Sequence, residues 1–139
     1  MKIVYWSGTG NTQKMANLIA EGIIEKGKAA ELINVSDANP DIFKDEDIVI
    51  LGCPAMGDEI LEEDEFEPFI EEISSKVSGK KVALFGSYGW GDGTWLRNFE
   101  ERMISYGCQS TLDLLMVENE PEGSSEEECR EFGRKIASL

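Results

Sequence analysis

The sequence contains no histidine, and its 139 residues include only 13 lysines and arginines against 28 aspartates and glutamates. Without histidine the chain lacks the usual general base and the commonest metal ligand. The formal net charge of −15 makes nucleic acid an unfavourable partner, because the phosphates of its backbone would be repelled. An anion that binds this protein must therefore be held mainly by neutral hydrogen-bond donors.

Cysteines and long apolar runs are also scarce. The three cysteines (Cys53, Cys108 and Cys129) are widely spaced and form no CxxC pattern, which argues against a disulfide framework or a zinc site. The longest apolar stretch, about residues 48–57, is too short to span a bilayer, and no apolar signal segment precedes the first expected strand. We expect one domain over residues 1–139, working in the cytoplasm as a monomer without membrane contact.

Short apolar runs alternate with amphipathic segments along the whole chain. The expected strands cover about residues 2–6, 30–35, 47–51, 81–85 and 109–117, and the expected helices about 11–25, 64–77, 94–106 and 125 onward. Ser125 and Glu128 have the spacing of a capping box. The alternation predicts parallel βαβ units in an α/β doubly wound sheet. Ligands bind such sheets at the carboxyl ends of the strands, so loops 7–12, 53–63 and 86–93 should converge on one site.

The first of these loops, Ser7-Gly8-Thr9-Gly10-Asn11-Thr12, combines hydroxyl and amide side chains with two glycines at the start of a helix. Such a turn suits a phosphate dianion without help from lysine or arginine. The Walker-type pattern is absent, and Gln13 stands where a dinucleotide fingerprint has its third glycine. No cysteine is followed by the arginine that a cysteine phosphatase needs. A polar turn that merely caps the helix is the alternative.

The second loop contains Ala55-Met56-Gly57-Asp58-Glu59. Gly57 gives the backbone a peptide that can change orientation, because glycine tolerates positive φ. Met56 offers a polarizable surface to an aromatic ring, and Glu59 could accept a hydrogen bond from a ring N–H. Taken alone, this loop is better explained as a flexible turn.

The third loop, Ser87-Tyr88-Gly89-Trp90-Gly91-Asp92-Gly93, places a tryptophan between glycines that have no side chains to bury it. A planar ligand stacked on Trp90 explains this best, although packing of Trp90 into the core is an alternative. Asp92 or Thr94 could cap the helix that follows. Together the three loops predict a mononucleotide-like ligand with a flat ring.

Over essentially its full length the chain resembles the short-chain flavodoxins of the clostridial kind, and the three motifs together carry this resemblance. The resemblance implies a three-layer, doubly wound parallel sheet of five strands in the order 2-1-3-4-5. It also implies non-covalent FMN in a low-potential one-electron carrier that passes between quinone, neutral semiquinone and hydroquinone states. The cofactor-binding residues that it implies are Ser7, Gly8, Thr9, Gly10, Asn11, Thr12, Ala55, Met56, Gly57, Asp58, Glu59, Ser87, Tyr88, Gly89, Trp90, Gly91, Asp92 and Asn119.

The resemblance also implies individual roles. Trp90 and Met56 would cover the two faces of the flavin ring, and the peptide after Gly57 would reorient on reduction to accept from the ring N5–H. Glu59 would bond the ring N3–H, and Asn119 would contact the ribityl side. One departure is Pro54, at a position where a hydroxyl would point toward the phosphate in relatives. Pro54 implies one phosphate donor fewer.

Between Asp58 and Glu72 the chain carries nine acidic residues and no basic one. They adjoin the expected flavin edge, where they would lower the second reduction potential and steer basic redox partner proteins. A solvated helix face is the plainer interpretation of the same charges.

Two other functions were compared with electron carriage. An FMN-dependent NAD(P)H:quinone or nitro reductase of the same fold is the alternative, but it needs room beside a flavin that Met56 and Trp90 would cover. A receiver-like signalling domain needs acidic residues after the first and third strands. This chain has Trp6-Ser7 and Gly52-Cys53 at those positions, which excludes that function.

Overall fold

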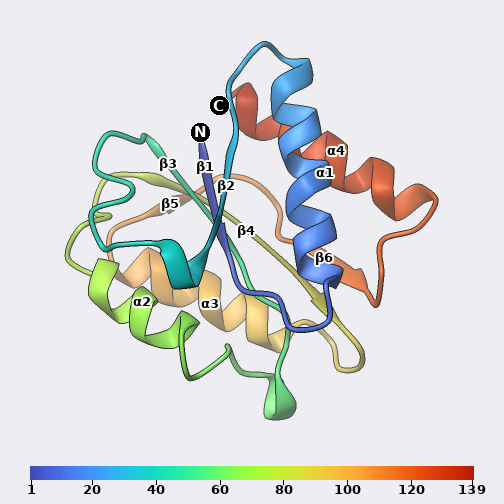
Figure 1. Cartoon of the computed structure of the whole chain (residues 1–139). Helices are drawn as coiled ribbons and strands as arrows, with labels where there is room; N and C mark the ends of the chain where they lie inside the picture. Colours follow the sequence, from blue (N-terminus) through green and yellow to red (C-terminus); the bar gives the residue numbers. More distant parts are fainter.

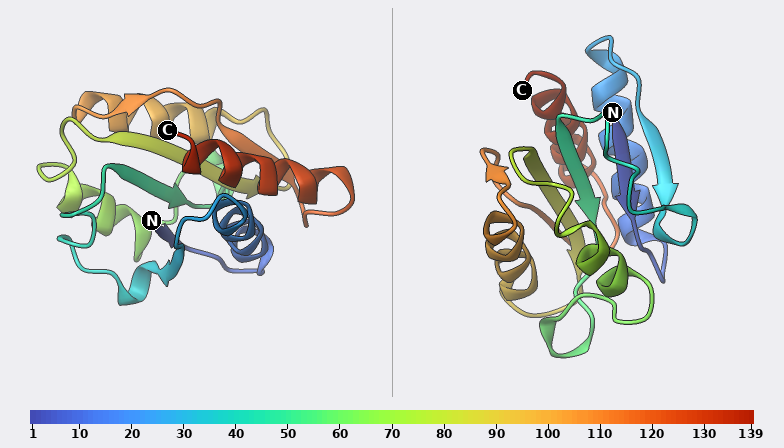
Figure 2. Two further views of the ribbon diagram at one scale, coloured as in Figure 1. Left: turned by 90° about the horizontal axis from the view of Figure 1, so that it is seen from above. Right: turned by 90° about the vertical axis from the view of Figure 1, so that its left-hand side faces the viewer.

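The computed structural model describes residues 1–139 and has three layers, with a parallel sheet between two pairs of helices (Figures 1 and 2). The strands are β1 (Lys2–Tyr5), β2 (Glu31–Asn34), β3 (Ile48–Gly52), β4 (Lys81–Tyr88), β5 (Gln109–Ser110) and β6 (Leu115–Glu118). The helices are α1 (Asn11–Glu25), α2 (Phe66–Ile73), α3 (Thr94–Ser105) and α4 (Ser124–Ala137), with short 3₁₀ turns η1 (Val35–Asp37) and η2 (Gly57–Glu59). The sheet order β2-β1-β3-β4-β5, with β6 also on β4, confirms the predicted doubly wound topology.

The last predicted strand is interrupted. Ser110 of β5 pairs with Val82, and Leu115 of β6 pairs with Phe85, so four edge residues lie opposite only two residues of β4. The edge therefore bulges by two residues before it rejoins the sheet. Past this bulge, β4 extends to Tyr88, farther than predicted, because its last residues pair with β6.

Each face of the sheet is covered by one pair of helices. Helices α2 and α3 pack on one face, where the rings of Phe66 and Phe99 meet edge to face at 5.7 Å between centroids. Helices α1 and α4 cover the other face. Strand β3 lies between these layers and is buried at every residue, as its wholly apolar sequence predicts for a central parallel strand.

Helices α1 and α4 touch backbone to backbone. A Cβ atom on Gly22 would lie 2.0 Å from the carbonyl oxygen of Arg130, and one on Gly133 would lie 2.0 Å from that of Ile19. Only glycine permits this approach at either position. Because α1 begins at the first loop and α4 follows the loop that carries Asn119, this contact fixes the spacing of two parts of the predicted site.

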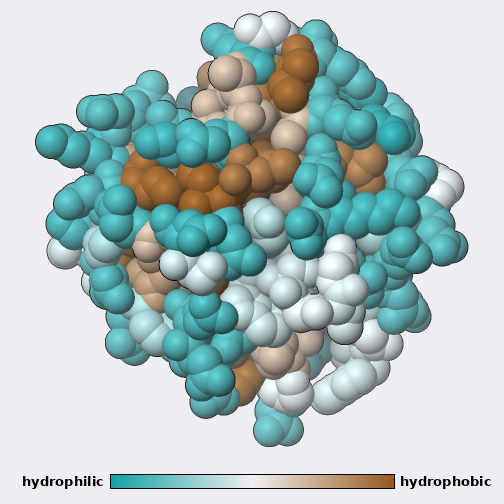
Figure 3. Space-filling model, viewed as in Figure 1, coloured by the Kyte–Doolittle hydropathy of each residue, from teal (hydrophilic) through white to brown (hydrophobic).

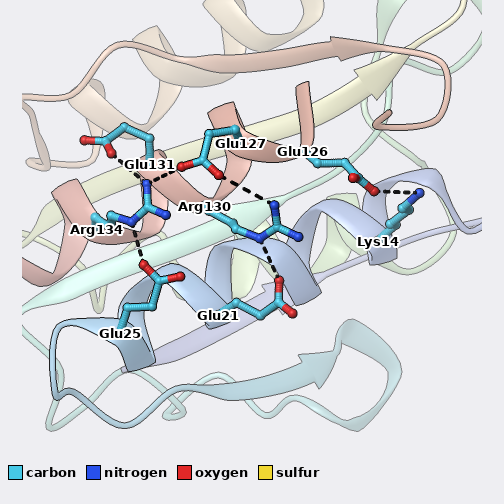
Figure 4. Close-up of polar contacts among 8 residues, drawn as sticks. All are labelled: Lys14, Glu21, Glu25, Glu126, Glu127, Arg130, Glu131 and Arg134. Atoms are coloured by element: carbon cyan, nitrogen blue, oxygen red, sulfur yellow. Dashed lines mark hydrogen bonds and ion pairs between the residues drawn. The ribbon is translucent and has the colours of Figure 1, made fainter. Parts of the chain in front are cut away.

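A row of ion pairs runs along the same helix contact (Figure 4). Its cations are Lys14 on α1 and two arginines on α4. The pairs are Lys14 with Glu120 at 3.4 Å and Glu126 at 3.3 Å, Arg130 with Glu21 at 3.1 Å and Glu127 at 3.6 Å, and Arg134 with Glu25 at 2.6 Å, Glu127 at 2.6 Å and Glu131 at 2.9 Å. Lys14 is the cation nearest in sequence to the first loop, and two carboxylates already neutralise it.

Helix α2 begins later than predicted, at Phe66. The backbone just before it forms a turn whose N–H groups bond to a buried carboxylate. The Glu62 side chain, 6% exposed, accepts hydrogen bonds from the N–H groups of Asp64, Glu65 and Phe66 at 2.8, 2.8 and 2.9 Å. Burial by itself would raise the pKa of Glu62, but these three bonds outweigh it and hold that pKa below its usual range.

Two predicted helix caps are wrong. Ser125 does not form a capping box with Glu128, because α4 begins at Ser124 and the Ser125 hydroxyl exchanges hydrogen bonds with the backbone of Glu122, at 2.8 and 2.9 Å. Helix α3 follows Gly93 at φ 89° and has no side-chain cap, so neither Asp92 nor Thr94 serves as one.

The three cysteines are buried and unpaired, and burial raises the pKa of the Cys53 and Cys129 thiols to about 12. None of the helices combines the length and the apolar character that crossing a lipid bilayer requires.

Candidate functional site

The three loops predicted to converge lie together at the carboxyl ends of β1, β3 and β4, where they enclose a hollow of about 330 Å³. This volume is within the range of small-molecule sites. Its lining residues are Trp6, Gly8, Thr9, Asn11, Pro54, Ala55, Met56, Ser87, Tyr88, Gly89 and Asn119. None of them is charged, and Figure 3 shows this part of the surface as a pale area of intermediate hydropathy bordered by hydrophilic residues.

The first loop is folded by its own serine. The Ser7 hydroxyl oxygen accepts from the N–H groups of Gly10 and Gln13, both at 3.2 Å, and Gly10 takes a left-handed conformation with φ 98°. Around this turn, several backbone N–H groups have no acceptor within the protein: those of Ser7, Gly8, Thr9, Asn11 and Thr12. With the amino end of α1 behind them, these free donors fit a phosphate group.

Thr12 and Ser87 connect the first loop to β4. The Thr12 side chain is 1% exposed, and its hydroxyl lies 2.9 Å from the Ser87 hydroxyl. The Ser87 N–H also donates to the Thr12 hydroxyl oxygen, at 3.4 Å. Thr12 therefore lies beneath the loop, where it holds two walls of the hollow together.

Backbone strain gathers at this site. Asp58, Glu59 and Asn119 have φ values of 64°, 52° and 59°, and they are the only non-glycine residues of the chain with positive φ. Such conformations are unfavourable for residues with side chains and cluster at functional sites. Gly57 is not in this region, and a Cβ atom there would have no neighbour within 4 Å. The left-handed conformation expected at Gly57 is thus adopted by the next two residues, Asp58 and Glu59.

The third loop carries its tryptophan into solvent. Trp90 is 66% exposed and does not line the hollow, so packing of Trp90 into the core is excluded. The buried ring is Trp95, which is 2% exposed, donates to the Cys53 carbonyl at 3.0 Å and lies 5.7 Å from the Tyr88 ring. Trp95 thereby fixes the third loop against the second.

Two lining residues, Trp6 and Pro54, are absent from the implied cofactor-binding residues, although the sequence already placed Pro54 beside the phosphate. The Trp6 ring lies so close to the first loop that a Cβ atom on Gly8 would be 2.9 Å from it, and its indole N–H donates to Glu65 at 3.3 Å. Trp6 directly follows β1, and this position at the carboxyl end of a strand could have identified it as a residue of the site.

The predicted residues divide into two groups. Those that line the hollow are Gly8, Thr9, Asn11, Ala55, Met56, Ser87, Tyr88, Gly89 and Asn119. Those outside the lining are Ser7, Gly10, Thr12, Gly57, Asp58, Glu59, Trp90, Gly91 and Asp92. Within the second group, Ser7 and Thr12 support the first loop, while Glu59 accepts from the Asp92 N–H at 3.1 Å and so joins the second and third loops.

The predicted acidic surface is smaller than the sequence count suggests. Glu62 is buried and accepts from the backbone N–H groups at the start of α2, and Glu67 pairs with Arg102. Six exposed carboxylates in this segment make no ion pair: Asp58, Glu63, Asp64, Glu65, Glu71 and Glu72. Asp58 and Glu63 lie in the second loop, Asp64 and Glu65 directly follow it, and Glu71 and Glu72 lie on α2.

A larger hollow of about 570 Å³ lies at the opposite end of the sheet, beside the first residues of β3, β4 and β5. Its charged side chains are balanced between lysines and carboxylates: Lys28, Lys80, Lys81, Asp45, Glu46 and Asp47. This hollow is at the wrong end of the strands for a ligand in this fold.

Comparison with known proteins agrees with the geometry. Residues 3–133 match the flavodoxin family. The chain is 69% identical over 139 residues to a flavodoxin of Clostridium beijerinckii, with all of both chains covered, and 42% identical to a flavodoxin of Megasphaera elsdenii, with 99% and 98% covered. The solution structure of two-electron reduced Megasphaera elsdenii flavodoxin superposes with a TM-score of 0.89 at 41% identity, covering 99% of this chain and 98% of that one.

Proposed function

The chain belongs to the flavodoxin family, and from this premise we propose that the neutral hollow at the carboxyl ends of the strands is its FMN site. FMN is the cofactor of this family. The protein is thus an electron carrier and not an enzyme that turns over its own substrate. Its family therefore favours electron carriage over the reductase alternative.

The single observation that carries the assignment is the set of free N–H donors in the first loop. Five backbone groups without a protein acceptor, at the amino end of a helix, match the several oxygens of a terminal phosphate. The Ser7 and Thr9 hydroxyls and the Asn11 amide would add side-chain donors. Pro54 supplies no donor on the facing wall of the hollow.

Bound FMN supplies a ring that can take up one or two electrons. Met56 in the lining and the exposed Trp90 would contact its two faces, and Glu59 would accept from its ring N–H. Asn119, whose backbone N–H donates to the Tyr88 carbonyl at 2.8 Å, would contact the ribityl chain. The peptide after Gly57 would change orientation, and it leads directly into the strained backbone of Asp58 and Glu59.

The charge distribution favours a low potential. No cation lines the hollow, and Lys14 is neutralised by Glu120 and Glu126. With a net charge of −15, the protein presents a negative field to a ring that gains electrons. The second electron, which would leave the ring anionic, is therefore opposed, and this lowers the second reduction potential.

As a flavodoxin, the protein exchanges electrons with redox partner proteins. We assign the docking surface to the six exposed carboxylates beside the second loop: Asp58, Glu63, Asp64, Glu65, Glu71 and Glu72. Their unpaired charges would attract a basic surface of the partner and accelerate encounter. We also place the protein in the cytoplasm as a monomer, since its three thiols are unpaired and its net charge opposes self-association.

A titration of the purified protein with dithionite under anaerobic conditions tests the central assignment. The visible spectrum should show bound flavin that is reduced in two separate one-electron steps. A protein that stays colourless after incubation with FMN would overturn it. Steady oxidation of NAD(P)H by the protein alone would instead favour the reductase.

A pair of matched double variants tests the docking surface. Asp64→Asn with Glu71→Gln removes two charges of this proposed docking surface, whereas Glu31→Gln with Asp45→Asn removes two exposed charges near the opposite end of the sheet. Electron transfer to cytochrome c, used as a basic probe partner, should slow more in the first variant at low salt. The difference should vanish near 1 M salt, where the Debye length is about 3 Å. Equal slowing in both variants would refute this surface.

A further inference from the structure

A chain of contacts links the second and third loops to a residue outside the hollow. Glu59 of the second loop accepts from the Asp92 N–H at 3.1 Å. Arg97, on the first turn of α3, donates to the Asp92 carbonyl at 2.7 Å and lies 3.2 Å from the Asp92 carboxylate. Thr94 donates to the same carboxylate at 2.6 Å and accepts from Arg97 at 3.3 Å.

These contacts matter because the glycine-rich part of the third loop, residues 89–93, has little else to hold it. Gly89, Gly91 and Gly93 offer no side chains, and Trp90 is exposed. Gly91 and Gly93 both have positive φ, at 98° and 89°. Glycine-rich backbone of this kind loses much conformational entropy when it is fixed in one conformation. An external support is required, and Asp92 is the loop residue that receives it.

The second and third loops also fit closely where they meet. A Cβ atom on Gly91 would lie 1.7 Å from a carboxylate oxygen of Glu59, and one on Gly93 would lie 2.4 Å from the Met116 sulfur and 3.1 Å from the Arg97 guanidinium. A small displacement of Asp92 would therefore also disturb Glu59. The Thr94 hydroxyl and the Arg97 guanidinium hold the pKa of Asp92 below its usual range, so this carboxylate stays charged toward Arg97 at neutral pH.

We propose that Arg97 is a positioning residue for the flavin ring, which acts through Asp92 to keep the second and third loops in the arrangement that receives the ring. Arg97 does not line the hollow, and its side chain is 49% exposed. Its guanidinium bonds both the carbonyl and the carboxylate of Asp92, a forked contact that lysine cannot reproduce. The inference rests on the proposed function, because it assumes that these two loops receive the ring.

The test compares Arg97→Gln with Arg102→Gln. Arg102 lies on the same helix and also forms an ion pair, but with Glu67 and not with Asp92, so its variant controls for the lost charge. Affinities for FMN and for riboflavin, which lacks the phosphate, are measured by quenching of flavin fluorescence. Hydrogen exchange of the Asp92 amide is measured in the protein without flavin.

Arg97→Gln should lower the affinities for FMN and riboflavin by the same factor, about three- to tenfold for partly exposed bonds of this kind. Flavin-free Arg97→Gln should unfold at about the same midpoint as the flavin-free Arg102→Gln control. The Asp92 amide should exchange faster in Arg97→Gln and at the wild-type rate in Arg102→Gln. Arg97→Lys should recover only part of the lost affinity.

An affinity loss for FMN that riboflavin does not share would overturn the proposal, because Arg97 would then act on the phosphate end. Equal losses in Arg97→Gln and Arg102→Gln would overturn it too, as would unchanged affinities. Failure of the proposed function is distinct from these results, since the wild-type protein would then bind neither FMN nor riboflavin.

Discussion

Replacing Glu62 by glutamine should destabilise the fold even though it removes one charge from a strongly acidic segment. The Glu62 carboxylate is 6% exposed and accepts three backbone hydrogen bonds at the start of α2. Glutamine keeps the shape, but its amide group turns a donor toward these N–H groups and leaves at least one unpaired. We expect a loss of about 2 kcal/mol, from helix-cap values of ~0.5–2 and bonds to charged groups of ~1.5–3 kcal/mol that do not add fully.

Charge relief acts in the opposite direction but is smaller. Removing one of several like charges on a helix surface stabilises by roughly 0.2–0.5 kcal/mol per pair. Glu63→Gln, at the exposed neighbouring residue, removes the same charge without touching the cap. Glu63→Gln should therefore be neutral or slightly stabilising, whereas Glu62→Gln should lower the melting temperature by roughly 5 °C.

The effect of Glu62→Gln should depend on pH in a defined direction. The pKa of Glu62 is lowered in the folded protein, so its contribution is complete above the unfolded pKa of about 4.3 and is lost as pH falls through the folded pKa. Urea unfolding at pH 7 and near pH 3 should show a large difference between wild type and Glu62→Gln at neutral pH that shrinks in acid. A difference that is the same at both pH values, or no larger than that of Glu63→Gln, would refute the reasoning.

Three further predictions concern the site and the helix contact. Trp90→Ala should weaken FMN binding by about 1–3 kcal/mol in a fluorescence titration, and a much smaller loss would mean that Trp90 is no platform for the ring. Gly57→Thr should leave the flavin-free fold intact, since its Cβ would meet no atom within 4 Å, but should lower the first one-electron potential. The expected penalty is about 1–2 kcal/mol for a left-handed peptide, and unchanged potentials in spectroelectrochemistry would remove Gly57 from the mechanism. Gly133→Ala should destabilise the protein by about 3 kcal/mol in urea unfolding, because its Cβ would lie 2.0 Å from the Ile19 carbonyl oxygen. A loss below about 1 kcal/mol would show that α1 and α4 separate easily.

Sequence alone predicted the parallel sheet and the convergence of the three loops, because both follow from local patterns. Apolar periodicity marks the elements, and the topology of parallel units brings the carboxyl ends of strands together. The bulge between Ser110 and Leu115 was not predictable in the same way. Nothing in the local pattern marks the two extra residues, and the pairing that reveals them is made with β4, far away in the chain.

Within the site, the sequence identified chemical groups better than their surroundings. Glu62 looks like one carboxylate among nine, and only its burial against the start of α2 shows that it is a cap. Trp6 was counted with its strand, although its place at the end of β1 puts its ring in the hollow. The left-handed backbone falls on Asp58 and Glu59 next to Gly57, because the conformation of a loop is set by what anchors both its ends.

The bulge at the last strand also bears on how this protein behaves at high concentration. A long, regular edge strand offers a row of unpaired backbone groups on which another chain can add, and this is a common start of aggregation. Here one edge of the sheet is broken into pieces of two and four residues, and the other, β2, is only four residues long. Neither edge is a good template for a second sheet. The edges of this sheet thus give little opportunity for strand exchange between copies of the chain.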